Sequence, residues 1–190
     1  GFELGVQMLT GLYGDSDEGA IKTAEKLISL SPDTVRIYPT IVLENTHLAE
    51  LLTSGEYASP SLEDTVSLCA ELLEMFYENN IKVIRLGLHS GGNVEDGYLS
   101  GPYHPAFGEL CESKIYLKRI RKKLLEIYKN ENNSETKNVT IYVNEKEISK
   151  ATGQKSKNKK SLLSDGFNVA IKGRNELEKY EIEMENTKCI

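Results

Sequence analysis

The hydrophobic pattern of the first thirty residues predicts a strand, a glycine turn and a helix. The stretch from Leu4 to Leu12 is mostly apolar, which is typical of a strand covered on both faces by helices. Gly11 and Gly14 then allow a sharp turn, and Asp15 with Glu18 predicts a capping box at the start of a helix. In α/β proteins the carboxyl edge of such a unit often holds a phosphate, nucleotide or cofactor. The alternative is that the glycines only make a tight turn.

The pattern continues through the next hundred residues as strands alternating with helices, which predicts a parallel sheet. Asn45 or Thr46 caps a short helix, and Ser61 with Asp64 forms a second capping box. The expected elements are a strand over 34–43, a helix to 52, a helix over 62–79, a strand over 81–89, a glycine-rich loop over 90–100 and a helix over 106–128. Ile127 is expected in the buried stripe of this last helix.

The pattern restarts on a smaller scale after a polar linker at residues 130–138. The expected elements are a strand over 139–143, a helix over 145–152, a turn over 153–156, a helix over 157–164, and strands over 167–172 and 180–184. Two short helices joined by a Gly-x-x-Gly-like loop between strands resemble a KH module, whose loop clamps about four nucleotides. The predicted domains are therefore residues 1–129 and a small α+β module at 139–190.

Composition is that of a soluble globular protein without a membrane-spanning segment or signal peptide, so a cytoplasmic location is expected. Cys69, Cys111 and Cys189 are far apart and predict free thiols. Cys69 and Cys111 fall on apolar helix faces, where cysteine packs as a small hydrophobe.

Charge is distributed unevenly along the chain. The net charge is −6, but the segment from Asn144 to Arg174 carries +5 and the remainder −11. Lysines gather at the KH-like turn, which supplies counter-charge for a nucleic-acid backbone. The candidate RNA-binding residues are Gly153, Gln154, Lys155, Ser156, Lys157, Lys159 and Lys160. Ser156 stands where a second glycine would be expected, and a lysine-rich helix hairpin that merely packs is the alternative.

Three short stretches, taken together, resemble the C-terminal half of a radical S-adenosylmethionine protein, and in particular the bacterial Elongator protein three-like family. They are Gly5-Val6-Gln7-Met8 with Gly11-Leu12-Tyr13-Gly14-Asp15, Val35-Arg36-Ile37-Tyr38-Pro39-Thr40, and Gly101-Pro102-Tyr103-His104-Pro105-Ala106-Phe107. The resemblance covers about residues 1–127. It implies an α/β fold, a partial (βα) barrel with parallel strands whose last two strands are the first two of this chain.

The resemblance also implies a cofactor wall. Two strands of such a barrel face S-adenosylmethionine, and the candidate cofactor-binding residues here are Gln7, Thr10, Gly11, Arg36, Tyr38 and Pro39. Small residues and a few polar groups suit an adenosine, and an arginine suits a carboxylate. His89 and His104 are the histidines near the cavity-side loops, and the catalytic residues are unknown.

The chain departs from the family at the 4Fe-4S cluster. The family binds that cluster through a Cys-x3-Cys-x2-Cys motif, and no cysteines here have this spacing. We therefore expect that the cluster and S-adenosylmethionine belong to a longer parent protein, that this chain alone binds neither tightly and is inactive, and that the missing half of the barrel or a second chain covers the open sheet edge.

Three functional hypotheses follow. The first is that the chain is the distal part of a radical S-adenosylmethionine enzyme that acts on RNA, with tRNA as the favoured substrate. The second is a cluster-free RNA-binding protein. The third is a small-molecule radical enzyme similar to the oxygen-independent coproporphyrinogen oxidases, in which the basic module is only structural.

Overall fold

The computed structural model describes residues 1–88, 97–129 and 136–186, and it divides the chain into two compact units, residues 1–111 and 112–190. The division falls inside α5 (Phe107–Tyr128), whereas the sequence analysis placed it at 130–138. The later part of α5 packs on C-terminal residues of unit 2, since the rings of Tyr116 and Tyr180 lie 5.4 Å apart. Of the expected linker, residues 130–135 lie outside the described part, and Lys137 and Asn138 already belong to a strand.

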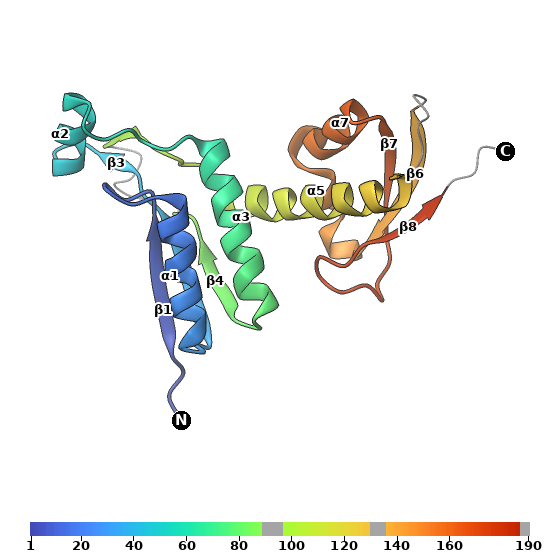
Figure 1. Cartoon of the computed structure of the whole chain (residues 1–190), viewed down its shortest axis with the longest axis horizontal. Coiled ribbons are helices and arrows are strands. Elements are labelled where there is room, and N and C mark those ends of the chain that lie inside the picture. The colour runs from blue at the N-terminus through green and yellow to red at the C-terminus, as the bar shows by residue number, and fades with distance from the viewer. Residues whose placement is uncertain (89–96, 130–135, 187–190) are drawn as a thin grey trace. The chain divides into compact units, whose positions relative to one another are not determined.

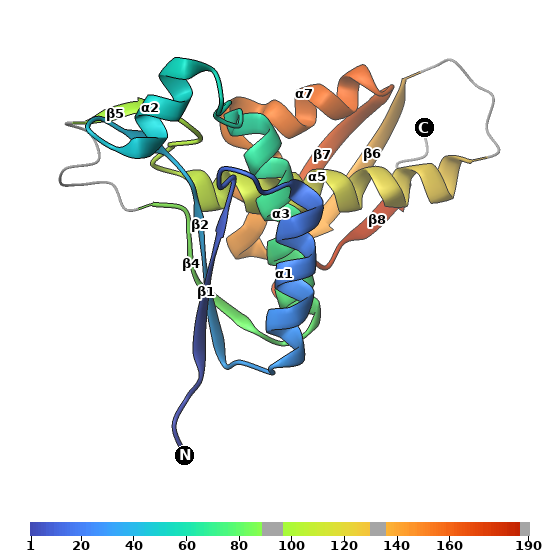
Figure 2. The ribbon, with the colours of Figure 1, turned by 60° about the vertical axis from the view of Figure 1, so that its left-hand side comes forward.

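Unit 1 is built on a parallel sheet in the order β1-β2-β4, formed by Gly5–Thr10, Thr34–Pro39 and Lys82–Leu86. Helices α1 (Asp17–Ser29) and α3 (Leu62–Glu78) lie on one side of this sheet (Figures 1 and 2). Val35, Ile37 and Phe76 are fully buried between the sheet and the helices. Residues 5–39 are thus two neighbouring parallel strands with an intervening helix, as the sequence predicted.

Among the described residues of unit 1, one face of β1 is covered and the other is open, which corrects the expectation of helices on both faces. Met8 is 3% exposed, whereas its neighbour Leu9 is 44% exposed. Because successive strand side chains point to opposite faces, the apolar run in β1 serves both a buried and an open surface of this unit.

The second predicted strand ends four residues early. Pro39 closes β2, and Val42–Leu43 form a separate strand, β3, which pairs antiparallel with β5 (Tyr98–Ser100). β5 occupies the end of the expected loop at 90–100; residues 89–96, including His89, lie outside the described part. Helix α2 (His47–Ser54) is capped by Thr46, one of the two predicted caps, and it ends before Gly55, two residues later than predicted.

The residue that caps α3 is the one predicted from the sequence, whereas the residue that caps α1 is the neighbour of the predicted one. The Ser61 hydroxyl accepts a hydrogen bond from the Asp64 backbone N–H, which confirms that cap. At α1 the cap is Ser16, whose Oγ accepts from the Gly19 N–H, and Asp15 instead accepts from the Ser16 N–H. Either residue type can cap a helix, so the sequence pattern alone could not separate neighbours.

Unit 2 contains a sheet in the order β7-β6-β8, formed by Phe167–Gly173, Lys137–Val143 and Glu183–Asn186. β6 is parallel to β7 and antiparallel to β8. Between β6 and β7 lie a 3-10 turn (Glu145–Glu147), α6 (Ile148–Thr152), a second 3-10 turn (Gln154–Ser156) and α7 (Lys157–Ser164). The last turn of α5 is more open than predicted, because Ile127 is 43% exposed while Leu124 is buried.

Neither Cys69 nor Cys111 forms a disulfide, and both are fully buried, as the sequence predicted. Burial raises the pKa of Cys69 to about 12, so its sulfur stays a thiol at neutral pH.

We expect iodoacetamide to label neither Cys69 nor Cys111 in the folded protein and both after denaturation in urea. Mass spectrometry of the digested protein measures this, and rapid native labelling of Cys69 would contradict the packing of α3 on β1.

Candidate functional site

Three of the six candidate cofactor-binding residues share the open face of the β1-β2-β4 sheet. Gln7 pairs in register with Arg36, and Leu9 with Tyr38. Gln7 and Arg36 are exposed and Tyr38 is half-buried. The structure therefore brings an amide, a guanidinium and a phenol together on one uncovered surface.

Thr10 and Pro39 lie on the other face of the sheet. Thr10 is 1% exposed, and its Oγ1 lies 3.9 Å from the Sγ of Cys69 in α3. Pro39 is also buried and pairs in register with Thr10. The resemblance places these two residues on the same wall as Gln7 and Arg36, but the alternation of side chains along the strands puts them on the opposite face.

Gly11 makes the turn that follows β1. Its φ of +72° lies in the left-handed region, and an added Cβ would lie 3.0 Å from Cγ of Pro60. The hydroxyl of Tyr57 donates a 2.7 Å hydrogen bond to the Gly11 carbonyl. The glycine is thus needed both for its backbone angle and for the close approach of Pro60.

Two hydroxyls near this turn were not singled out from the sequence. Within the described part of the chain, Thr40 Oγ1 and Ser59 Oγ are buried without a hydrogen-bond partner. Thr40 follows β2 directly, and its backbone N–H donates to the carbonyl of Thr10. Buried hydroxyls of this kind are suited to an ordered water or a polar ligand group at the carboxyl edge of the strands.

His104 has a structural role in the described turn before α5. Its Nδ1 accepts a 3.0 Å hydrogen bond from the backbone N–H of Ala106. This hydrogen bond holds the backbone in place at the start of α5, which explains why a histidine occupies position 104.

The predicted RNA-binding loop has an unusual backbone. Gly153 has φ +76°, and Lys155 and Ser156 are both left-handed, with φ of +50° and +59°. Left-handed residues other than glycine are uncommon and carry strain. The turn leads directly into α7, whose N-cap Ser156 makes no side-chain capping bond within the described chain. Lys155, Lys157 and Lys160 are exposed around it, with Gln154 beside them, while Lys159 is half-buried.

Asn158 anchors the loop from inside and was missed by the sequence analysis. It is 4% exposed, and its Nδ2 donates to the carbonyls of Ser113 (2.9 Å) and Ala151 (3.0 Å) and lies 3.0 Å from the hydroxyl of Ser113. A Cβ on Gly153 would lie 3.0 Å from the backbone N and the Cγ of Asn158. The glycine turn and the buried amide therefore fit each other, and α6, α7 and α5 meet at this side chain.

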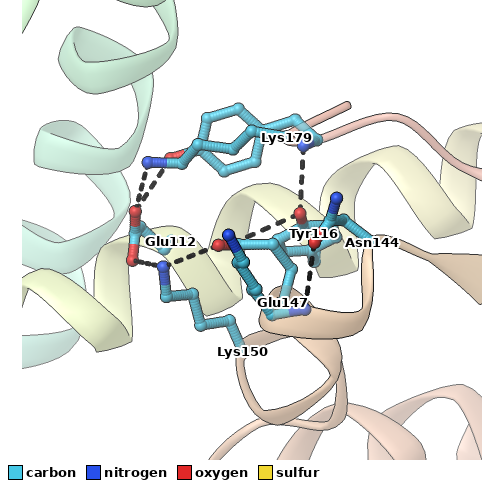
Figure 3. A network of polar contacts seen from close by, with 8 residues as sticks. Glu112, Tyr116, Asn144, Glu147, Lys150 and Lys179 are labelled. Carbon is cyan, nitrogen blue, oxygen red and sulfur yellow. Dashed lines mark hydrogen bonds and ion pairs between the residues drawn. The ribbon is translucent and has the colours of Figure 1, made fainter. Parts of the chain in front are cut away.

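A network of charges holds α6 to α5 in unit 2 (Figure 3). The carboxylate of Glu112 contacts the ammonium groups of Lys150 at 2.7 Å and Lys179 at 2.6 Å. Burial raises the pKa of Glu112, but the two lysines outweigh burial, so this pKa lies below its ordinary value. Burial lowers the pKa of Lys150, but Glu112 and Glu147 outweigh it and raise this pKa overall. Glu112 and Lys150 are therefore both charged at neutral pH.

Tyr116 and Tyr180 complete the network. The Tyr116 hydroxyl accepts from the backbone N–H of Tyr180 at 3.0 Å and donates to Glu147 at 3.4 Å. Burial raises the pKa of both phenols, so they remain protonated donors. The side chain of Asn144 donates to the carbonyl of Leu177 nearby. The network connects α5, the first 3-10 turn, α6 and the segment between β7 and β8, whereas Asn158 connects α7 to α5 and α6.

The described residues contain no group of three or more histidine, cysteine, aspartate or glutamate side chains that could hold a metal ion. In the same part of the chain, no helix has the length and hydrophobicity needed to cross a membrane.

Comparison with known proteins gives two findings. The Radical_SAM C-terminal domain matches residues 32–118. An uncharacterized protein of Methanocaldococcus jannaschii, MJ0486, is 34% identical over 67 residues, which make up 35% of this chain. The match spans 21% of the length of that relative. Residues 32–118, which include β2 and β4 of the parallel sheet, are therefore similar to the C-terminal domain of radical S-adenosylmethionine proteins.

Proposed function

We propose that the chain forms the distal part of a radical S-adenosylmethionine enzyme that modifies RNA, with tRNA as its substrate class and an Elongator protein three-like parent. The domain match over residues 32–118 supports the enzyme class. The RNA assignment depends on a single observation, which is the lysine-bordered left-handed turn between α6 and α7.

Residues 139–190 are proposed to act as a KH-like clamp on the RNA backbone. Strand β6, two short helices and strand β7 follow in the order expected for such a module. Gly153 is buried against Asn158 and shapes the turn from inside, while the small, half-buried Ser156 leaves room for a backbone to approach and the surrounding lysines neutralise phosphates. Charge supports this role, because residues 112–190 contain eighteen Lys or Arg against twelve Asp or Glu.

Gln7, Arg36 and Tyr38 would hold S-adenosylmethionine on the open face of the sheet. In this class of enzyme the cofactor supplies the carbon–sulfur bond whose cleavage begins radical chemistry. A guanidinium can pair with the cofactor carboxylate, and the amide and phenol can bind its remaining polar groups. The residues that the structure describes do not fit a 4Fe-4S cluster, so that group is assigned to other parts of the parent protein.

Binding of unmodified tRNA transcripts to the full 190-residue chain tests the proposal. Changing Lys155→Gln together with Lys157→Gln should weaken binding by about 20-fold, since removing one phosphate-binding lysine costs about fivefold near physiological salt. The slope of log affinity against log salt should also fall by about 1.4 for the two lysines. Fluorescence anisotropy of labelled RNA over a salt titration measures both quantities.

A matched control removes two lysines from another part of the chain. Lys22 and Lys26 lie exposed on α1, and Lys22 pairs with Glu18. Lys22→Gln with Lys26→Gln should leave affinity and slope unchanged. No binding of wild-type protein to tRNA at low salt would overturn the RNA function and favour a small-molecule radical enzyme instead.

A further inference from the structure

Strand β7 forms an unprotected edge of the sheet in unit 2. The sheet has the order β7-β6-β8, so one side of β7 pairs with β6, and the other side pairs with no strand among the described residues. β7 runs for seven residues in continuous register with β6, and its sequence contains neither proline nor an acidic residue. Such an edge presents a row of backbone N–H and C=O groups with which another strand can pair.

The opposite edge of the same sheet is protected. β8 is only four residues long, and two of the four are Glu183 and Glu185. Glu183 forms an ion pair with Arg174, and Glu185 accepts a hydrogen bond from the hydroxyl of Tyr142. Short edge strands and charged side chains discourage pairing between sheets, so the contrast between the two edges singles out β7.

Apolar side chains beside the edge of β7 are only partly covered. Ile141 of the central strand is fully buried, whereas its register partner Ile171 in β7 is half-buried. Phe167 lies on the same face of β7 and is also half-buried, although its ring lies 5.5 Å from that of Tyr128. A strand added at this edge would remove more of both side chains from water, which favours its addition.

Leu163 of α7 faces the same edge. Ser161, two positions earlier, accepts a hydrogen bond from Arg121 of α5, and helix residues two positions apart point in nearly opposite directions. α5 lies toward the β8 side of the sheet, since Lys123 donates to the carbonyl of Ile182, while α7 packs on β7. Leu163 therefore points away from α5 toward the free edge of β7, and it is 53% exposed.

We propose that β7 pairs with β7 of a second copy of this chain, antiparallel and about a two-fold axis, so that the two sheets become one. The axis keeps the covered faces of both sheets on the same side, and side chains alternate along a strand. Paired residues must therefore come from the same face, which allows only registers centred on a residue. Centring on Ala170, the midpoint of Phe167–Gly173, pairs all seven residues of the strand.

The side chains of β7 are complementary to one another in this register. Val169 of one copy lies opposite Ile171 of the other, so apolar groups meet on the covered face. On the open face, the amide of Asn168 lies opposite the ammonium group of Lys172, and the exposed Ala170 lies opposite itself. Lys172 is the one charged residue in the sequence of β7, so the pairing brings no like charges face to face.

Sedimentation velocity of the full chain, without RNA, tests for self-association. The chain has a mass of 21.2 kDa, so a dimer has twice that mass. Contacts that bury less than about 1,200 Å² are typically weak, so we expect dimer at about 100 µM protein and monomer at about 1 µM. A monomer at both concentrations would overturn the proposal. The RNA function does not enter this test, so the two can fail separately.

Two variants that add the same charge to β7 should act in opposite directions. Ala170→Glu places two carboxylates opposite each other and should weaken self-association by about fivefold, because like charges in directly opposed positions repel. Asn168→Glu places each carboxylate opposite Lys172 of the other copy and should strengthen self-association by about fivefold. Dimerisation that both variants change equally, or that neither changes, would overturn the proposed pairing.

Mixing experiments and a control complete the test. Ala170→Lys alone should also weaken self-association, but an equimolar mixture of Ala170→Lys with Ala170→Glu should form a heterodimer more tightly than either variant forms a homodimer. Failure of the mixture to associate would contradict the register. Thr23→Glu adds the same charge at an exposed position of α1 and should leave self-association unchanged. Far-UV circular dichroism during thermal unfolding verifies that each variant folds.

Discussion

Asn158→Ala should lower the free energy of unfolding of unit 2 by about 3 kcal/mol. The change removes the donor that satisfies the buried carbonyls of Ser113 and Ala151. The Ala151 carbonyl lies in the last turn of α6 and has no partner within that helix, so leaving it unpaired costs about 1–3 kcal/mol, and the lost hydrogen bond to the Ser113 carbonyl adds to this at a site that is 4% exposed. Urea unfolding followed by tyrosine fluorescence measures the effect, and Tyr116 and Tyr180 report from the same unit.

Asn168→Ala is the control for the removal of an asparagine from unit 2. Asn168 is exposed on β7 and its Nδ2 donates to Oδ1 of Asn138, so its removal should cost less than about 0.5 kcal/mol. A destabilisation below about 1 kcal/mol for Asn158→Ala would show that the buried amide is not the anchor of α6 and α7. Because a Cβ on Gly153 would contact Asn158, the destabilised variant should have a less ordered turn at residues 153–156.

Glu112→Gln should be the next most destabilising change, at about 2 kcal/mol near neutral pH. The amide keeps the shape of the side chain but lacks the charge that attracts Lys150 and Lys179. The expected loss of stability is smaller than for a fully buried ion pair, because the Lys179 side chain is 40% exposed and screened by water. Lys150 retains Glu147 at 3.1 Å, which limits the destabilisation further.

The effect of Glu112→Gln depends on pH in a definite direction. The folded-state pKa of Glu112 is lowered, so its carboxylate stabilises the fold above the unfolded-state pKa, and this stabilisation disappears as the pH falls through the folded-state value. The difference between wild type and variant should therefore be largest near neutral pH and vanish in acid. Urea unfolding at a series of pH values measures it.

Glu126→Gln provides the matched control on the same helix. Glu126 is exposed on α5, so its change should alter stability little at any pH. A constant difference between wild type and Glu112→Gln from neutral to acid pH would contradict the network, since it would mean that the charge of Glu112 does not stabilise the fold.

Local patterns in the sequence were enough to predict most of the elements. The spacing of apolar residues placed α3 and α7 nearly to the residue, and Ser61 and Gly55 mark helix ends for reasons that lie within one turn of the chain. The parallel pairing of β1 and β2 followed from the connecting helix. These features depend on neighbours in sequence, which a single chain displays.

The candidate sites were harder to predict, because they depend on partners far apart in sequence. Nothing near Asn158 signals that its amide reaches Ser113, and nothing near Glu112 signals Lys179. The alternation in β1 and β2 could have separated Thr10 from Gln7, but the mostly apolar run hid which face would be covered. Long-range packing, rather than local preference, decides these contacts.

The position of β6 at the centre of its sheet has a consequence for synthesis on the ribosome. Both strands that pair with it, β7 and β8, are made later. Until then Val139, Ile141 and Val143 stand on a strand with two unsatisfied edges, which is a template for aggregation. A nascent chain that pauses before Glu183 would thus be a natural client for a chaperone.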